Sequence, residues 1–243
     1  MAHDFSGSIA DIVDRDYRTA EVFKKHHINF CCGGQLSLKD SCLQRDIEYE
    51  ELVDELVLAT RTIVVPGNLP LEDWDLNFLI DFVVHIHHAY IFQTIPVLSQ
   101  EIESFAAGHE RKFPGINKLP EAFRRLSSLL LIHNKHEDEI IFPYIRQITD
   151  AYRRKEVYGN LFVRTLRKPL NNIQSEHNEI KKLANELKEL TNEFNFPEKT
   201  CTTYTLLYRK LSAFYDNLMQ HSYLETKILF PKAIAIENRL LQT

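Results

Sequence analysis

Two segments of the chain repeat one pattern of residues that can bind metal ions. Both read H-x3-E-x3-[IL]-F-P, the first starting at His133 with Glu137 and the second at His221 with Glu225. Residues four apart lie on one face of a helix, and imidazole with carboxylate suits iron, manganese or zinc. The repeat therefore predicts paired metal ligands one helical turn apart.

A further histidine precedes each copy at nearly the same distance, His88 before the first and His177 before the second. The segment is therefore interpreted as a duplicated helical hairpin. All six residues fall within apolar stripes of helical period, so they are predicted to face one core. The stripes are defined by Val84, Ile91 and Ile95; by Leu126, Leu130 and Ile140; by Ile173, Ile180 and Ala184; and by Phe214, Leu218 and Ile228.

The two glutamates favour a metal centre over an ordinary core. A single buried histidine is usually a hydrogen-bonded core residue, but an unpaired carboxylate in an apolar interior is very costly unless it is paired or bound to a cation. A closed structural zinc site needs only four ligands, so six imply two ions. The predicted metal ligands are His88, His133, Glu137, His177, His221 and Glu225.

The number of metal–ligand bonds narrows the choice of cofactor. Four histidines give one bond each and two bridging glutamates give two each, and an oxo or hydroxo bridge adds two more. Each ion is then about five-coordinate with one open position, and the ions lie roughly 3.5–4 Å apart. Ferritin-like di-iron bundles use Glu-x-x-His, which does not occur in this chain. Two iron ions with an oxo or hydroxo bridge are therefore expected.

Long amphipathic stretches must position these ligands, and four are present, with Pro120 and Pro169 near two of the helix starts. Shorter helices are predicted around residues 9–22 and 47–59. The fold is thus predicted to be all-α, with an up-down four-helix bundle over 74–240, a linker over 61–73 and a small helical domain over 1–60. The four stretches cover residues 74–106, 120–151, 169–192 and 203–240.

Composition excludes several classes of protein. The 243 residues are 44% hydrophobic and 26% charged, as in globular domains. The net charge is −5, and the Lys and Arg residues form no basic stripe that could bind nucleic acid. No secretory signal or long uninterrupted apolar run is seen, so a cytoplasmic protein without a membrane partner is expected. The four cysteines are too few for a disulfide scaffold and are expected to be reduced: Cys31, Cys32, Cys42 and Cys201.

Taken together, these motifs resemble the di-iron iron-sulfur cluster repair proteins of the YtfE/ScdA type, also called repair of iron centres, over nearly the whole chain. The resemblance implies a hemerythrin-like bundle and a cytoplasmic stress protein that helps restore clusters damaged by nitric oxide or oxidants, by donating iron or processing nitric oxide. Besides the two repeats, it is carried by Phe30-Cys31-Cys32-Gly33-Gly34, by His88 followed by Pro96 and His109, by Ser175-Glu176-His177-Asn178-Glu179 and by Cys201-Thr202-Thr203.

The resemblance also implies partners, namely damaged or apo iron-sulfur proteins and nitric oxide or oxygen as small ligands, with the protein a monomer or homodimer. Two alternatives stay open: a hemerythrin-like sensor or binding protein for oxygen or nitric oxide, and a nitric oxide reductase. Whether the protein is an enzyme is therefore undecided. Oxygen-carrying hemerythrins have a fifth histidine and a bridging aspartate, so reversible oxygen carriage is not expected here.

Several other residues have more than one interpretation. Cys31 and Cys32 either form a tight structural turn or relay iron or nitrogen oxides as reactive thiolates. His85 and His87 are predicted to lie on the helix surface, next to the ligand His88. The carboxylate of Glu176 is a candidate for orienting a ligand. A gating or orienting role for His109 is left open.

Overall fold

The structure, a computed structural model, describes residues 4–30, 34–62, 69–111, 115–156, 163, 169–197 and 200–242. The chain divides into two compact units, Met1–Gly67 with Phe196–Arg209, and Asn68–Asn195 with Lys210–Thr243. Regular structure in the described residues is helical, apart from an isolated bridge between Ser8 and Ser37.

Four short helices form the first unit around a small apolar core. Phe23, Leu52 and Leu56 are fully buried in it, and Leu206 joins them from the beginning of α11 (Thr202–Tyr223). The four helices are α1 (Ile9–Arg15), α2 (Thr19–Lys25), α3 (Leu38–Arg45) and α4 (Tyr49–Thr60).

The helix boundaries in this unit differ from the predicted ones. One helical piece was expected around residues 9–22, but the chain leaves the helix at Asp16, whose carboxylate accepts the backbone N–H of Arg18 at 3.0 Å. Helix α3 was not predicted, although the sequence has a residue before its first turn that can cap the helix. The Ser37 hydroxyl accepts the backbone N–H of Asp40 at 3.2 Å, which satisfies one of the free donors of the first turn.

The cysteine-containing turn is described only at its edges. Cys31, Cys32 and Gly33 lie outside the described residues, as do residues 63–68 of the predicted linker. The carbonyl of Gly34 accepts the backbone N–H of Ala10 at 2.9 Å. A Cβ atom at Gly34 would lie 2.7 Å from the carbonyl oxygen of Phe30, so only glycine fits there.

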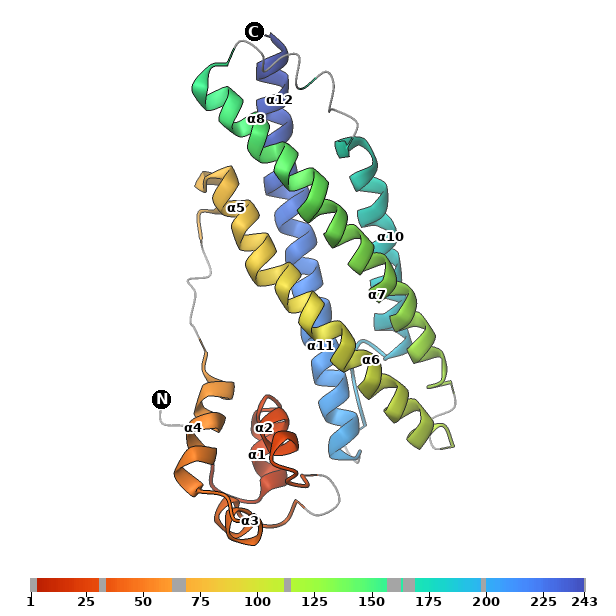
Figure 1. Cartoon of the computed structure of the whole chain (residues 1–243). Coiled ribbons are helices and arrows are strands. Elements are labelled where there is room, and N and C mark those ends of the chain that lie inside the picture. The colour runs from red at the N-terminus through yellow and green to blue at the C-terminus, as the bar shows by residue number, and fades with distance from the viewer. Residues whose placement is uncertain are drawn as a thin grey trace. The chain divides into compact units, whose positions relative to one another are not determined.

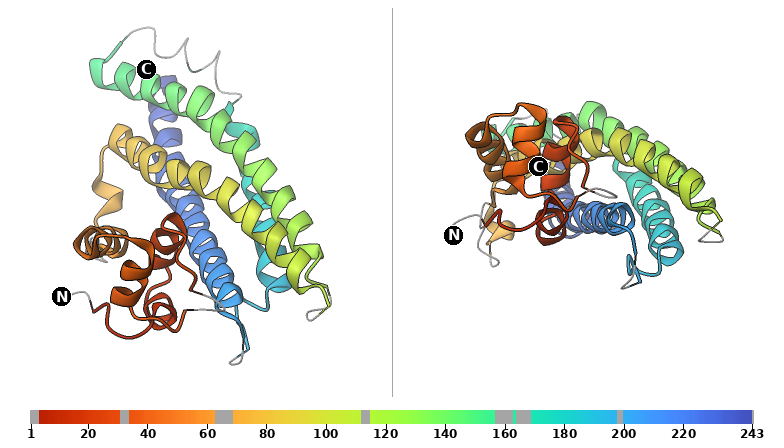
Figure 2. Two further views of the ribbon diagram at one scale, coloured as in Figure 1. Left: turned by 60° about the horizontal axis from the view of Figure 1, so that its bottom comes forward. Right: turned by 90° about the horizontal axis from the view of Figure 1, so that it is seen from below.

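Four long helical stretches form the second unit, and they alternate in direction (Figure 1). Figure 2 shows the same stretches from two further directions. The predicted all-α fold with a four-helix bundle is confirmed. The stretches are α5 (Leu76–Phe82), η2 (Val83–His88) and α6 (Ala89–His109); α7 (Lys118–His136), η3 (Glu137–Ile141) and α8 (Phe142–Arg154); α10 (Pro169–Leu190); and α11, η4 (Leu224–Leu229) and α12 (Phe230–Gln242), with a short 3-10 turn η1 (Leu71–Asp73) before the first.

Three of these stretches are interrupted by a π-helical turn, η2, η3 or η4. In η3, for example, the backbone N–H of Phe142 bonds to the carbonyl of Glu137, five residues earlier. A π turn holds more residues per turn than an α-helix and so changes which side of the helix faces the core. Ile140, predicted to be buried, is 49% exposed, whereas Ile141 is fully buried. The prediction assumed an uninterrupted α-helix and was wrong at this residue.

The first stretch of the bundle is apolar enough to pass a simple test for a membrane span. By length and composition alone, Leu76–His109 could cross a bilayer, although no other described helix could. The most apolar window of this stretch is 39% buried inside the protein, and the stretch contains the predicted ligand His88. Core helices of bundles pass the same test, so this single stretch is weak evidence for a membrane protein.

Candidate metal centre

The six predicted ligand residues come together in the middle of the bundle. Each side chain is at most 5% exposed. They form two overlapping groups, and within each group one ligand atom from every residue lies within 4.8 Å of the others. The groups are His88, Glu137, His221 and Glu225, and His133, Glu137, His177 and Glu225. Because both glutamates belong to both groups, the arrangement fits two neighbouring cations that share two carboxylates.

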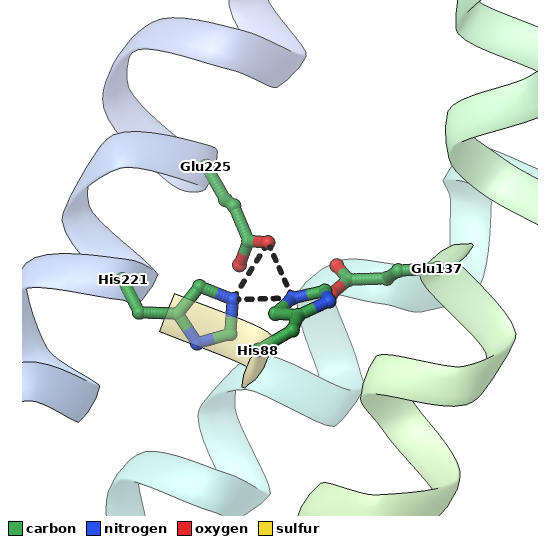
Figure 3. A group of neighbouring side chains, drawn as sticks. All are labelled: His88, Glu137, His221 and Glu225. Carbon is green, nitrogen blue, oxygen red and sulfur yellow. Dashed lines mark hydrogen bonds and ion pairs between the residues drawn. The ribbon is translucent and has the colours of Figure 1, made fainter. Parts of the chain in front are cut away.

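The first group joins three helical stretches (Figure 3). Nε2 of His88 lies 2.9 Å from Nε2 of His221. Nε2 of His221 is in turn 2.8 Å from Oε1 of Glu225, and Nε2 of His88 is 3.4 Å from Oε2 of Glu137. Four donor atoms therefore point at one small volume, which we call position 1.

The second group repeats this geometry with the other oxygen of each glutamate. Nε2 of His133 and Nε2 of His177 are 3.0 Å apart. Oε1 of Glu137 lies 3.3 Å from Nε2 of His133, and Oε2 of Glu225 lies 3.3 Å from Nε2 of His177. We call this volume position 2. Each carboxylate thus directs one oxygen to each position, as a bridging ligand does.

Two carboxylates outside these groups hold the imidazoles in place. Oδ1 of Asp138 lies 2.8 Å from Nδ1 of His88, and Oε2 of Glu176 lies 2.8 Å from Nδ1 of His133. Such a bond keeps the proton on Nδ1 and leaves the Nε2 lone pair free for a cation. The predicted role of Glu176 agrees with this contact. Asp138 was not predicted, because it lies beside the apolar stripe, although it directly follows Glu137 in the repeat.

Comparison with known families supports a cation site in this bundle. Residues 79–233 match the family model described as the hemerythrin HHE cation binding domain. The chain belongs to the hemerythrin HHE family. Residues 6–60 match a second model, ScdA_N, described as a domain of unknown function. The HHE domain binds metal cations, and the clustered histidines and glutamates could hold them.

Curated relatives match this HHE protein over most of its length. It is 29% identical over 225 residues to the iron-sulfur cluster repair protein YtfE of Cronobacter sakazakii, covering 90% of this chain and 92% of the relative. Identity to YtfE of Escherichia coli is 28%, with 90% and 93% covered. The iron-sulfur cluster repair protein ScdA of Staphylococcus haemolyticus is 25% identical, with 92% and 96% covered. The predicted resemblance to the YtfE/ScdA type is confirmed.

The chemistry of the buried oxygens in this HHE domain fits a cation. Both carboxylate oxygens of Glu137 and Oε2 of Glu225 are buried without a hydrogen-bond partner. Buried polar atoms are nearly always satisfied, and buried anions need a positive partner. Iron, manganese or zinc would satisfy these oxygens and the imidazole nitrogens together.

Without a cation, the same charges hold protons on the imidazoles. Burial lowers the pKa of His88, but the neighbouring carboxylates of Asp138 and Glu137 outweigh this effect and raise the pKa to about 11. The pKa of His177 is raised to about 9, against the effect of burial, by the nearby carboxylates of Glu137 and Glu225. Burial would raise the pKa of Glu225, but the surrounding imidazoles hold it well below its usual value. Cation binding must therefore displace protons.

Two neighbouring histidines were predicted to be on the surface, and only one of them is. His85 is exposed, as predicted. His87 is only 3% exposed, so its prediction was wrong, because the π turn η2 turns it toward the core. Its ring is nearly parallel to that of His221, at 12° and 5.8 Å between centroids. Burial is the main reason that the pKa of His87 falls to about 4. His87 therefore stays neutral near pH 7.

His109, at the end of α6, is half-buried and packs within its own helix. Its ring stacks on that of Phe105 at 4.2 Å between centroids, and its Nδ1 lies 3.0 Å from the carbonyl oxygen of Phe105. These two contacts with Phe105 fix the orientation of the His109 ring at the end of the helix.

Proposed function

We propose that this protein holds two iron ions, bridged by Glu137, Glu225 and an oxo or hydroxo group, and helps to repair iron-sulfur clusters damaged by nitrosative or oxidative stress. The observation that supports this most strongly is the sharing of both carboxylates between two histidine pairs, each oxygen facing one pair. The ligands proposed for the two ions are the six residues of positions 1 and 2.

The choice of iron rests on the donor set and on the relatives. Imidazole and carboxylate without thiolate suit iron, manganese or zinc. The relatives that match this chain over most of its length are called iron-sulfur cluster repair proteins. A protein that restores such clusters needs a supply of iron, and a buried pair of iron ions is such a supply.

The ability of the ligand histidines to take up protons when a cation leaves is consistent with release of the ions. A di-iron centre supplies Lewis acidity and one-electron redox changes when it is bound. When a cation leaves, protons on His88 and His177 compensate for the two buried carboxylates, so no uncompensated charge remains. Asp138 and Glu176 keep the rings of His88 and His133 oriented for rebinding.

We further propose that Cys31 and Cys32 relay iron or nitrogen oxides, as adjacent reactive thiolates can. The client molecules would be damaged or apo iron-sulfur proteins, with nitric oxide or oxygen as small ligands. The cytoplasm is the compartment proposed, because reduced thiols persist there. The match of residues 6–60 to the domain ScdA_N favours a repair protein over a gas sensor with another output domain.

Iron transfer is the decisive test. The iron-loaded protein is mixed anaerobically with an apo iron-sulfur protein, and iron is measured in both after separation. Iron should leave this chain as the cluster forms on the client. Retention of all iron, while an iron salt restores the same client, would contradict donation. Sustained consumption of nitric oxide with an electron donor would instead identify a nitric oxide reductase.

A further inference from the structure

Two consecutive histidines of the first helical stretch are both buried. His87 is 3% exposed and His88 is 1% exposed. Neighbouring residues of a regular α-helix point about 100° apart, so they belong to different apolar stripes. Here both lie in the π turn η2, where the backbone N–H of Ala89 bonds to the carbonyl of Val84, five residues earlier.

The two histidines continue two different apolar stripes. Before the turn, buried residues recur every three or four positions up to Val83, and the next position in this stripe is His87. After the turn, the stripe followed backwards from Ile91 reaches His88. The π turn therefore joins two helical registers, each of which directs one histidine to the core. The buried residues are Leu76, Leu79, Ile80 and Val83 before the turn, and Ile91, Ile95, Leu98 and Ile102 after it.

Both histidines contact the same predicted ligand. The ring of His88 is 4.7 Å from that of His221 between centroids, and the ring of His87 is 5.8 Å from it. Nδ1 of His87 is buried and has no hydrogen-bond partner. His87 thus places an imidazole with a buried, unbonded nitrogen beside His221, a predicted ligand of position 1.

The other half of the duplicated bundle has a different residue at this place. Glu176 precedes His177 as His87 precedes His88, and it contacts His133, the histidine of the opposite hairpin. His87 likewise contacts His221 of the opposite hairpin. The carboxylate of Glu176 is committed to His133, whereas an imidazole can bind a cation directly.

We propose that His87 is an alternative metal ligand of position 1, replacing His88 when η2 shifts its register by one residue. Position 2 has no such alternative among the described residues, because Glu176 stands there in place of an imidazole. One of the two cations could then change a ligand without leaving the protein. The inference rests on the proposed metal centre, but not on cluster repair.

The test compares two histidines related by the duplication. Full-length wild type, His88→Ala and His177→Ala are loaded anaerobically with Fe²⁺, and iron is measured per folded chain after a weak chelator is added. The wild type should hold about two ions and His177→Ala about one, because two positions with separate histidine pairs are expected. His88→Ala should still hold about two, released faster than from the wild type. The double variant His87→Ala/His88→Ala should hold about one.

A second substitution at residue 88 controls for misfolding of the alanine variant. His88→Gln keeps a polar group that can bond to Asp138, and circular dichroism confirms the helical content of each variant. Equal iron loss in the His88 and His177 variants, or equal iron in His88→Ala and the double variant, would overturn the role of His87. A wild type that binds no iron pair would overturn the metal centre itself, and this inference with it.

Discussion

Oε2 of Glu176 lies 2.8 Å from Nδ1 of His133, although the two residues belong to different halves of the duplicated bundle. The bond fixes the ring of His133 and makes its Nε2 a stronger donor. Glu176→Gln should therefore lower iron affinity at position 2 by about 10–100-fold, the usual cost of losing such a contact. Chelator competition measures this affinity. Glu179→Gln, which changes an exposed carboxylate on the same helix, is the control and should leave the affinity unchanged.

Substitution of a glutamate that faces both positions should remove more iron than substitution of a histidine that faces only one. Glu225 faces both positions, so Glu225→Ala should remove nearly all bound iron. His133 faces position 2 only, so His133→Ala should remove about half of it, because each ion needs its own histidine pair. Iron analysis of the purified variants checks both, with the exposed His85→Ala as the control. A tight zinc site that neither substitution affects would contradict the assignment.

The metal-free protein should lose stability as the pH rises. The pKa values of His88 and His177 in the folded protein, about 11 and about 9, lie above the ordinary histidine value of 6.5. Protons bound to these two histidines therefore stabilise the folded protein. The stabilisation is full below about pH 6.5 and is lost as the pH rises toward the two folded-state pKa values. Each retained proton changes the unfolding free energy by about 1.4 kcal/mol per pH unit.

Thermal unfolding from pH 7 to pH 10, with and without iron, measures this effect. The melting temperature of the metal-free protein should fall across this range, while that of the iron-loaded protein should fall much less, because cations have replaced the protons. Iron affinity should rise over the same range. Parallel melting curves for the two forms would show that these imidazoles hold no protons in the metal-free protein.

The paired cysteines test whether the N-terminal unit takes part in repair. Cys31→Ala/Cys32→Ala should leave the bound iron and its absorption spectrum intact, because neither thiol is among the predicted ligands. Repair in cells stressed with nitric oxide should nevertheless fall if the thiols relay iron. Iron content, thermal unfolding and repair are measured on the same variant. Full repair by a stably folded double variant would refute the relay, whereas repair that falls only with folded protein indicates a structural turn.

The six clustered residues were predictable because the duplicated pattern and the apolar phase agree on each of them. His87 and Ile140 were not, because they depend on hydrogen bonds between residues five apart, which helical periodicity does not show. One signal was available in the repeat itself. Pro143 and Pro231 are the second residues after η3 and η4, and proline lacks the N–H that an α-helix would use there.

Each π turn also amounts to one inserted amino acid, since it leaves the helices on both sides in contact with the core. A homologue with a regular α-helix at η3 would therefore need one residue fewer between Glu137 and Phe142 to bury the same side chains. Alignments of such homologues need a one-residue gap inside a helix, where gaps are normally penalised. An ungapped alignment would pair the residues on one side of the turn with the wrong positions of the homologue.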